Sequence, residues 1–439
     1  MISAHGLGGG SDLPIPANYA IFGGTAALVL SFAVLLLAWR SPRYTEDQSA
    51  GRRVPGLGRV VDAMWVRVAL RLSGLAYFGF GAWAAVAGPD ELINPVLGMA
   101  YVLLWVGLVP LSLLFGPFYR AISPVRTIHL GLARLSRSDP ETGLLTYPGW
   151  LGYWPAALGL FAFAWLELVS PDQTEVSSVR LWFALYLAFA LIGGALFGDR
   201  WIERSDPFEV YSTLVGHLSP WGRDNEDHLV VRSPLRGISR LTAAPGLVGV
   251  ASVLLGSTAF DSFRGSGTWI RFVQASSLDV TLLETSLLSF VCLVVAVTFS
   301  VATMMTGVDH DKGSRSSLPG LFAASIVPIV VGYVIAHYLS YLVEYGQITL
   351  IQMSDPLGTG ADLFGTAGWD VNYWLSLHPA TLASIKVLAI VVGHVLGVIV
   401  AHDKAIQALP RRSHVVGQIP LLLAMVLYTF GGLYLLFGA

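Results

Sequence analysis

Three side chains that could exchange protons or bind a ligand share one face of an apolar segment. His337, Tyr341 and Glu344 are spaced i, i+4 and i+7, the spacing of neighbours along a helix. At about 1.5 Å rise per residue, His337 lies roughly 12 Å below the outer end of its helix. Ionisable groups at such depth in a membrane are costly, so this stripe is a candidate site for catalysis or ion movement.

The next apolar segment adds a cation and a second histidine. Lys386 lies at roughly 9 Å depth in this segment, and His394 lies at roughly 21 Å. Lys386 is therefore level with the stripe, and an ion pair with Glu344 would allow both groups to stay charged. We predict that these two side chains pair.

Further carboxylates fall near the outer ends of their own segments, among them Asp261, Glu284 and Glu167. If they converge with the stripe, the result is an outward-facing polar pocket. The alternative is that each carboxylate lies at the water interface, where ionisation costs little. The candidate catalytic residues of the pocket are His337, Tyr341, Glu344, Lys386, Glu284 and Asp261.

The same residues suggest possible cofactors. His337 and Glu344 could ligate a divalent metal, joined by His5 or His378 from the outer face, with Lys386 stabilising developing negative charge. His394 could bind haem b together with His337, but a depth difference of roughly 9 Å works against shared ligation. The alternative for His394 is a packing role, with a hydrogen bond to a neighbouring carbonyl.

The elements that would position these residues are membrane helices. Of the 439 residues 54% are hydrophobic and 12% are charged, whereas about 25% are charged in ordinary globular domains. Apolar runs of about 18 or more residues recur along the chain, long enough to cross a bilayer. The ten expected spans are 17–39, 67–88, 96–118, 149–169, 179–198, 244–260, 281–306, 318–345, 380–401 and 417–437.

The positive charges fix the expected orientation. Arginine and lysine gather in alternate loops, which the positive-inside rule assigns to the cytoplasm. The outer side holds only Arg264 and Arg271, with Arg180 at the outer edge of the fifth span. We therefore expect an all-α, polytopic transmembrane helix bundle that forms a single domain over residues 1–439. Both the N- and C-termini should be extracytoplasmic.

Two loops are long enough to carry structure of their own. Residues 199–243 form the longest cytoplasmic loop, and their mixed apolar spacing predicts an interfacial amphipathic helix followed by a β-like run over 229–231. Residues 346–379 form an acidic and aromatic extracytoplasmic loop without lysine or arginine. This loop is either a lid over the outer pocket or an ordinary interfacial connection.

Charge and motifs limit the classes of function. A net charge of −2, with the arginines distributed among loops, argues against a nucleic-acid partner. The expected partners are the lipid bilayer and a small-molecule or ion substrate, and an oligomer or larger complex is compatible with the sequence. The chain contains no G-x-S-x-G nucleophile elbow, P-loop or H-E-x-x-H motif.

Several short stretches of the chain are characteristic: His5-Gly6-Leu7-Gly8-Gly9, Ser11-Asp12-Leu13-Pro14, Phe208-Glu209-Val210-Tyr211-Ser212, Leu218-Ser219-Pro220, Gly256 to Asp261 and His337 to Gln347. In these stretches the chain resembles the fenitrothion hydrolase family of bacterial integral membrane proteins. The resemblance implies hydrolysis of an organophosphate triester in the bacterial plasma membrane, without a catalytic motif that can be carried over. The alternatives are a secondary transporter or proton relay, and a haem- or metal-binding subunit of a larger complex.

Overall fold

The computed structural model describes residues 13–44, 51–307, 314–410 and 414–438, so His5 and its neighbours lie outside the described residues. In these ranges the chain is almost entirely helical, as expected. The chain divides into two compact units. Unit 1 comprises Met1–Ser49, Leu235–Tyr341 and Tyr373–Ala439, and unit 2 comprises Ala50–Pro234 and Leu342–Asn372.

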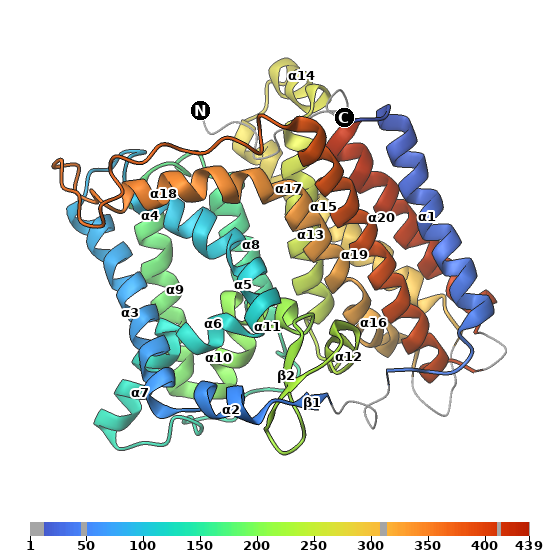
Figure 1. The fold of residues 1–439 in the computed structure, drawn as a ribbon, viewed down its shortest axis with the longest axis horizontal. Helices are drawn as coiled ribbons and strands as arrows, with labels where there is room; N and C mark the ends of the chain where they lie inside the picture. The colour runs from blue at the N-terminus through green and yellow to red at the C-terminus, as the bar shows by residue number, and fades with distance from the viewer. Residues whose placement is uncertain (1–12, 45–50, 308–313, 411–413, 439) are drawn as a thin grey trace. The chain divides into compact units, whose positions relative to one another are not determined.

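Unit 1 is built from long helices that pack side by side, with α17 against α19, α13 against α15, and α1 against α19 and α20 (Figure 1). Its helices are α1 (Ala17–Ala38), α12 (Pro234–Ser239), α13 (Leu247–Arg264), α14 (Gly267–Ala275), α15 (Val280–Met304), α16 (Leu318–Phe322), α17 (Val327–Ser340), α19 (Pro379–Ala408) and α20 (Ile419–Phe437). A π-helical turn, η6 (Tyr341–Tyr345), continues α17 into α18 (Gly346–Gln352).

Glycines allow α17 and α19 to approach closely. A Cβ atom at Gly393 would lie 2.6 Å from the carbonyl oxygen of Pro328, and one at Gly397 would lie 2.7 Å from that of Ser325. These two glycines form a G-x-x-x-G pair on one face of α19, the spacing that lets membrane helices pack backbone to backbone. The close approach fixes the height and rotation of His337 on α17.

The cytoplasmic end of α1, in the expected orientation, is tied to α19 by buried polar groups. The Asp403 carboxylate accepts hydrogen bonds from the backbone N–H of Arg43 at 2.7 Å and from the indole N–H of Trp39 at 3.2 Å. The His402 ring nitrogens lie 2.9 Å from Gln418 Oε1 and 3.0 Å from the Trp39 carbonyl oxygen. His402 is therefore a buried residue that connects α19 to Gln418 and to Trp39.

Unit 2 contains two long helices, several short ones and the sheet (Figure 1). Its other helices are α2 (Pro55–Val61), α3 (Met64–Ala87), α4 (Pro95–Gly98), the π-helix η3 (Met99–Val106), α5 (Leu108–Phe115), α6 (Phe118–Ile122), α7 (Pro124–Ser136), α8 (Trp154–Leu168), α9 (Val176–Phe197), α10 (Asp199–Ser205) and α11 (Pro207–Gly216). The expected third span is thus bent by 40° where η3 meets α5.

A small antiparallel sheet closes one side of unit 2. Its strand order is β1 (Arg52–Arg53), β3 (Leu229–Val231) and β2 (Trp221–Arg223). Val230 of the central strand lies opposite Arg53 on one side and opposite Gly222 on the other. The β-like run expected over 229–231 is confirmed as the central strand. The Arg53 guanidinium binds Asp224 at 2.7 Å, across the turn that joins the other two strands.

The segment expected to lie on the bilayer surface is instead buried. Nearly all side chains of α11 are inaccessible to solvent, and the helix packs against α5, α6 and α8 inside unit 2. Its polar residues explain the difference, because Ser212 shares a hydrogen bond with Ser112 at 2.8 Å and Glu209 binds Arg126 at 2.5 Å. The amphipathic pattern of this segment therefore coincides with polar contacts inside unit 2.

Asp206 caps α11 and accepts three hydrogen bonds. One carboxylate oxygen accepts from the backbone N–H groups of Phe208 at 3.0 Å and Glu209 at 3.2 Å, and the other accepts from the Tyr186 hydroxyl at 2.9 Å. Burial, together with the nearby Glu209 carboxylate, raises the pKa of Asp206 to about 7. This group lies between α10 and α11, outside the candidate membrane spans.

The raised pKa predicts a loss of stability on going from acid to neutral pH. Between the ordinary carboxyl pKa of about 4 and a pKa of about 7, the folded chain binds the proton more tightly than the unfolded chain. Stability should therefore fall as pH rises through this window, by up to about 4 kcal/mol. Asp206→Asn keeps the capping oxygen, so its melting temperature in detergent should fall less between pH 5 and 8. Asp172→Asn, at an exposed carboxylate, is the control and should behave as wild type. A melting temperature that falls as much in Asp206→Asn as in wild type would contradict this prediction.

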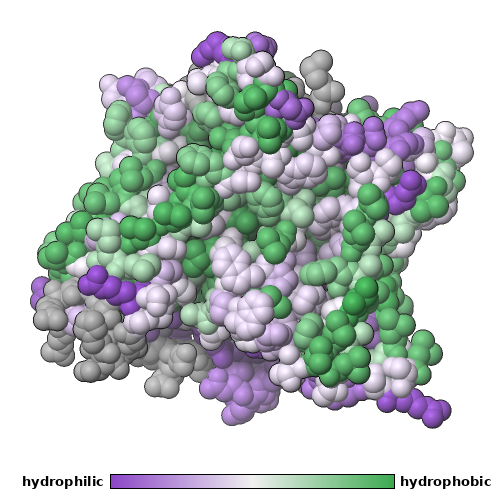
Figure 2. Space-filling view, turned by 180° about the vertical axis from the view of Figure 1, so that it is seen from behind, coloured by the Kyte–Doolittle hydropathy of each residue, from purple (hydrophilic) through white to green (hydrophobic). Residues whose placement is uncertain are grey.

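Six helices among the described residues are long and apolar enough to cross a membrane, and up to seven if the bent η3–α5 pair is one span. These six are Ala17–Ala38, Val176–Phe197, Val280–Met304, Val327–Gln352, Pro379–Ala408 and Val416–Phe437. Their outward side chains include Leu37 and Leu427, exposed by 73% and 67%. On the face seen in Figure 2, hydrophobic side chains cover much of the surface and hydrophilic ones gather toward the upper and lower margins. Such a surface suits lipid better than water.

Candidate functional site

The strongest polar cluster of unit 1 forms where the end of α13 meets α17. A Cβ atom at Gly256 would lie 2.8 Å from the Cα atom of Cys292, so α13 can lie against α15 only because this residue is glycine. That packing sets the rotation of the last turns of α13, which carry Asp261 and Ser262. Both residues face His337 of α17.

The two ring nitrogens of His337 are both hydrogen-bonded. Nε2 lies 2.8 Å from Oδ2 of Asp261, and Nδ1 lies 3.0 Å from Oγ of Ser262. The Tyr338 hydroxyl donates to the same Asp261 oxygen at 3.2 Å, with its ring edge-on to the imidazole. His337 is 3% exposed and Asp261 is 7% exposed. We refer to His337, Asp261, Ser262 and Tyr338 as the His337 cluster.

This arrangement can hold a proton in two ways. With neutral imidazole, Nε2–H donates to the Asp261 carboxylate and the Ser262 hydroxyl donates to Nδ1. With imidazolium, Nδ1–H donates to Ser262, whose hydroxyl then donates to the Thr258 carbonyl oxygen at 3.1 Å. Both protonation states therefore have complete hydrogen bonds. A buried site built in this way can gain and lose a proton without leaving a polar group unpaired.

Glu284 lies near the start of α15 and belongs to the rim of this cluster. Its carboxylate is 3.8 Å from the Arg264 guanidinium at the end of α13. Arg264 is in the last turn of α13, where a cation interacts favourably with the helix dipole. Glu284 thus has a partner of its own, and none of the hydrogen bonds described for His337 involves it.

The remaining residues of the predicted pocket are buried but divided between the two units. Lys386 of α19 is 1% exposed and Tyr341 is 6% exposed, both in unit 1, whereas Glu344 is 3% exposed and belongs to unit 2. All three make polar or electrostatic interactions. Lys386 and Glu344 belong to different units, and their pairing stays a prediction.

The proposed metal and haem ligands have different surroundings. Both nitrogens of His337 are already engaged by Asp261 and Ser262, which leaves no lone pair for a metal in this arrangement. Among the described residues, no three histidine, cysteine, aspartate or glutamate side chains lie close enough to hold a metal ion. His378 is exposed, stacks on Trp374 and bonds its carbonyl oxygen at 2.7 Å.

His394 makes the carbonyl hydrogen bond expected of a packing histidine. Its Nδ1 lies 2.8 Å from the Ile390 carbonyl oxygen one turn earlier on α19, and the ring is 1% exposed. Its Nε2 has no hydrogen-bond partner within the described part of the chain. This orientation is also that of a metal-bound histidine, so the geometry leaves both interpretations of His394 open.

Two members of the cluster, Ser262 and Tyr338, were not selected from the sequence. Each follows directly on a candidate residue, Asp261 or His337, but adjacent residues on a helix point in directions about 100° apart. Only the contact between α13 and α17 brings all four side chains together. No protein-family model, curated protein or solved structure matches the chain. The fold and site define a helical protein with several candidate membrane spans and a buried acid–imidazole pair.

Proposed function

We propose that this chain is a polytopic protein of the bacterial plasma membrane in which the His337 cluster relays protons, as part of a proton- or ion-transporting activity. We further propose ten spans, with both termini outside the cytoplasm. The long α3 and α13 and the shorter α8 would join the six most apolar helices and the bent η3–α5 pair. Helices are present at all ten positions where the sequence predicts a span.

The observation that carries the proposal is the double hydrogen bonding of His337 by Asp261 at 2.8 Å and Ser262 at 3.0 Å. Ionisable groups within membrane helices usually belong to ion pathways or proton relays. Burying a histidine here for packing alone would cost free energy, because its ring nitrogens need hydrogen bonds that an apolar side chain does not need. Imidazole is also the side chain that most readily exchanges a proton near neutral pH.

Purified protein in liposomes that contain a pH-sensitive dye tests the proposal. An inside-negative potential, imposed with potassium and valinomycin, should drive protons inward and acidify the lumen faster than in protein-free vesicles. Asp261→Asn should slow this acidification, because imidazolium loses its counter-charge. Wild-type vesicles that acidify no faster than protein-free ones would overturn the relay.

The topology has a test of its own. A reporter that is active only outside the cytoplasm should work when fused after Ala439 and fail when fused after Arg223. Arginine is concentrated in the loops that the positive-inside rule assigns to the cytoplasm, and the loop containing Arg223 is one of them. The opposite pattern of reporter activity would rule out the proposed orientation.

A second candidate function is hydrolysis of phosphotriesters by Ser262, which the contact between Ser262 and His337 favours. Ser262 Oγ would attack phosphorus, His337 Nδ1 would take the hydroxyl proton, and the aryl oxide would leave. Asp261 would stabilise the imidazolium through Nε2. In serine hydrolases Nε2 faces the serine and Nδ1 faces the aspartate, whereas here Nδ1 faces Ser262 and Nε2 faces Asp261. Water would then hydrolyse the phosphorylated serine.

Mass spectrometry separates the two candidates. After incubation with a dialkyl nitrophenyl phosphate, a hydrolase should carry a dialkylphosphoryl group on Ser262 and release nitrophenolate. Ser262→Ala should lose both signals. A proton relay should show neither signal while vesicle acidification persists. Phosphorylated Ser262 without proton flux would favour the hydrolase over the relay.

A further inference from the structure

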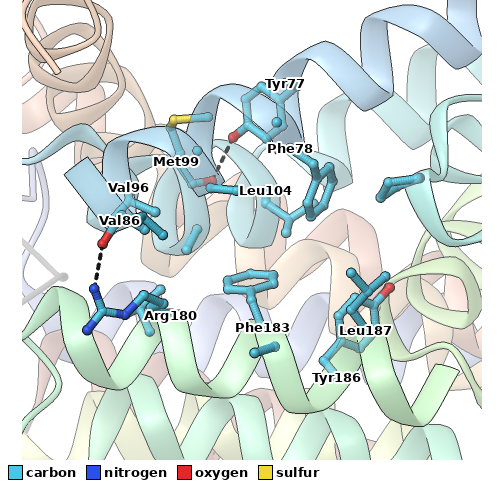
Figure 3. A pocket seen from close by; sticks show the side chains of 18 of the residues that line it. Tyr77, Phe78, Val86, Val96, Met99, Leu104, Arg180, Phe183, Tyr186 and Leu187 are labelled. Carbon is cyan, nitrogen blue, oxygen red and sulfur yellow. Dashed lines mark hydrogen bonds between the residues drawn. The ribbon is translucent and has the colours of Figure 1, made fainter. Parts of the chain in front are cut away.

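Unit 2 contains a cavity of about 470 Å³ between α3, η3, α7 and α9 (Figure 3). Its walls are almost entirely hydrophobic, and the side chains that meet across it include Leu75, Phe78, Val96, Leu104, Phe183 and Leu187. The volume is within the range of small-molecule and cofactor sites. No residue of the His337 cluster lines this cavity, so its occupant is a separate question.

The cavity follows one face of α9. Arg180, Phe183, Ala184 and Leu187 line it at spacings i, i+3, i+4 and i+7, over a length of roughly 10 Å along the helix. Figure 3 shows Arg180 at one end and Leu187 and Tyr186 at the other. An apolar cavity with a cation at one end matches an amphiphile with one anionic group.

Arg180 is positioned to bind an anion. One of its guanidinium nitrogens donates to the Ala85 carbonyl oxygen at 3.0 Å, which directs the group toward the end of α3 (Figure 3). Guanidinium has five N–H donors, and no carboxylate of the described residues forms an ion pair with Arg180. The nearby Asp90 instead accepts from the backbone N–H of Val176 at 2.6 Å. Arg180 is exposed, so its other donors can be reached.

Arg180 is an unusual cation for its place in the chain. It is one of the few arginines on the expected outer side of the membrane. A bound phosphate would neutralise its charge there.

The opposite wall is a broken helix. η3 is a π-helix of eight residues, and the Tyr77 hydroxyl donates to the Met99 carbonyl oxygen at 2.7 Å, at its first residue. Wide helical turns of this kind occur frequently at functional sites. Within a membrane, such irregular backbone is found where it lines a cavity.

We propose that this cavity holds an acyl chain of an anionic phospholipid of the surrounding bilayer, with the lipid phosphate bound to Arg180. The hydrophobic length along α9 accommodates part of the chain, and the exposed guanidinium supplies the charge complementarity. This lipid site does not depend on the relay proposed for His337.

Native mass spectrometry of delipidated protein with added dioleoylphosphatidylglycerol tests this inference. Wild-type protein should retain phosphatidylglycerol in preference to dioleoylglycerol, which has the same chains without the phosphate. Arg180→Gln should weaken phosphatidylglycerol retention about tenfold and remove this preference. Arg271→Gln, an exposed arginine of α14, is the matched control and should behave as wild type.

A second variant tests the chain-binding part. A Cβ atom at Gly79, which lines the cavity, would meet nothing within 4 Å, so Gly79→Phe adds a large side chain at the cavity wall without a clash at Cβ. This variant should retain about tenfold less phosphatidylglycerol. Gly23→Phe on α1 is the matched control, because a Cβ atom there also meets nothing within 4 Å. If Gly79→Phe does not fold, Ala184→Leu replaces it. Wild-type retention by Arg180→Gln or by the folded cavity-filling variant would overturn the proposal.

Discussion

Replacing His337 with alanine is expected to reduce proton flux in liposomes to the level of protein-free vesicles. The variant removes the imidazole whose Nε2 contacts Asp261 and whose Nδ1 contacts Ser262. It also leaves the buried Asp261 carboxylate without its imidazole partner, although Tyr338 still donates to it at 3.2 Å. The protein should therefore still insert and purify, while the transfer of protons stops.

The matched control for this variant is His378→Ala. His378 belongs to the same unit, but its side chain is exposed and its ring nitrogen lies 2.7 Å from the Trp374 carbonyl oxygen one turn earlier. This control should keep the wild-type flux. His402 is unsuitable, because its hydrogen bonds to Gln418 and Trp39 make it part of the fold. A His337→Phe variant with wild-type flux would return His337 to a packing role and remove the basis of the relay.

Arg126→Met is expected to destabilise the protein by about 3–5 kcal/mol. The guanidinium of Arg126 holds Glu209 with two hydrogen bonds of 2.5 and 2.6 Å and reaches Asp199 at 3.3 Å. The Glu209 side chain is 1% exposed, so the variant leaves a buried carboxylate without its counter-charge. The melting temperature in detergent should fall markedly.

The double variant Arg126→Met/Glu209→Gln distinguishes this cause from lost packing. Because it removes both charges, it should recover part of the stability lost in Arg126→Met alone. Additive losses for the two substitutions would show that the ion pair contributes nothing beyond the separate side chains. Arg200→Met is a suitable control, since its pair with Glu203 is between half-exposed side chains of one helix.

The apolar segments determine most of the helix positions. The expected spans 17–39, 179–198 and 417–437 correspond closely to α1 (Ala17–Ala38), α9 (Val176–Phe197) and α20 (Ile419–Phe437). Long hydrophobic runs constrain helices strongly because every backbone polar group must be satisfied within the helix. The break at Gly107 in the third segment was not visible, since its flanking residues are as apolar as those of a continuous helix.

Burial of charged residues was harder to predict. Arg126 and Glu209 look like loop residues in the sequence, because each lies in a short polar stretch between apolar segments. They form a buried pair because α7 and α11 fold into unit 2. Sequence spacing describes the faces of one helix, whereas this pair depends on two helices whose relative position only the fold determines.

The candidate site was predicted in part. The sequence selected both His337 and Asp261 as catalytic candidates, and the structure brings them within 2.8 Å. The sequence did not indicate that His337 and Asp261 face each other, because the rotation of α13 depends on the close packing of Gly256 against Cys292. Ser262 was missed for the same reason. The expected partner of the stripe, Lys386, stays a prediction.

The central claim is that His337 gains and loses a proton while it stays between Asp261 and Ser262. Nitrogen-15 NMR of protein labelled at histidine, in lipid nanodiscs, measures this directly. We predict one buried histidine that carries its proton on Nε2 when neutral and becomes doubly protonated in acid, with a signal that is missing in His337→Ala. Asp261→Asn should change the Nε2 chemical shift of this histidine, because the carboxylate that accepts from Nε2 is lost. A His337 signal that keeps one protonation state over the whole pH range in which the protein stays folded would contradict the relay.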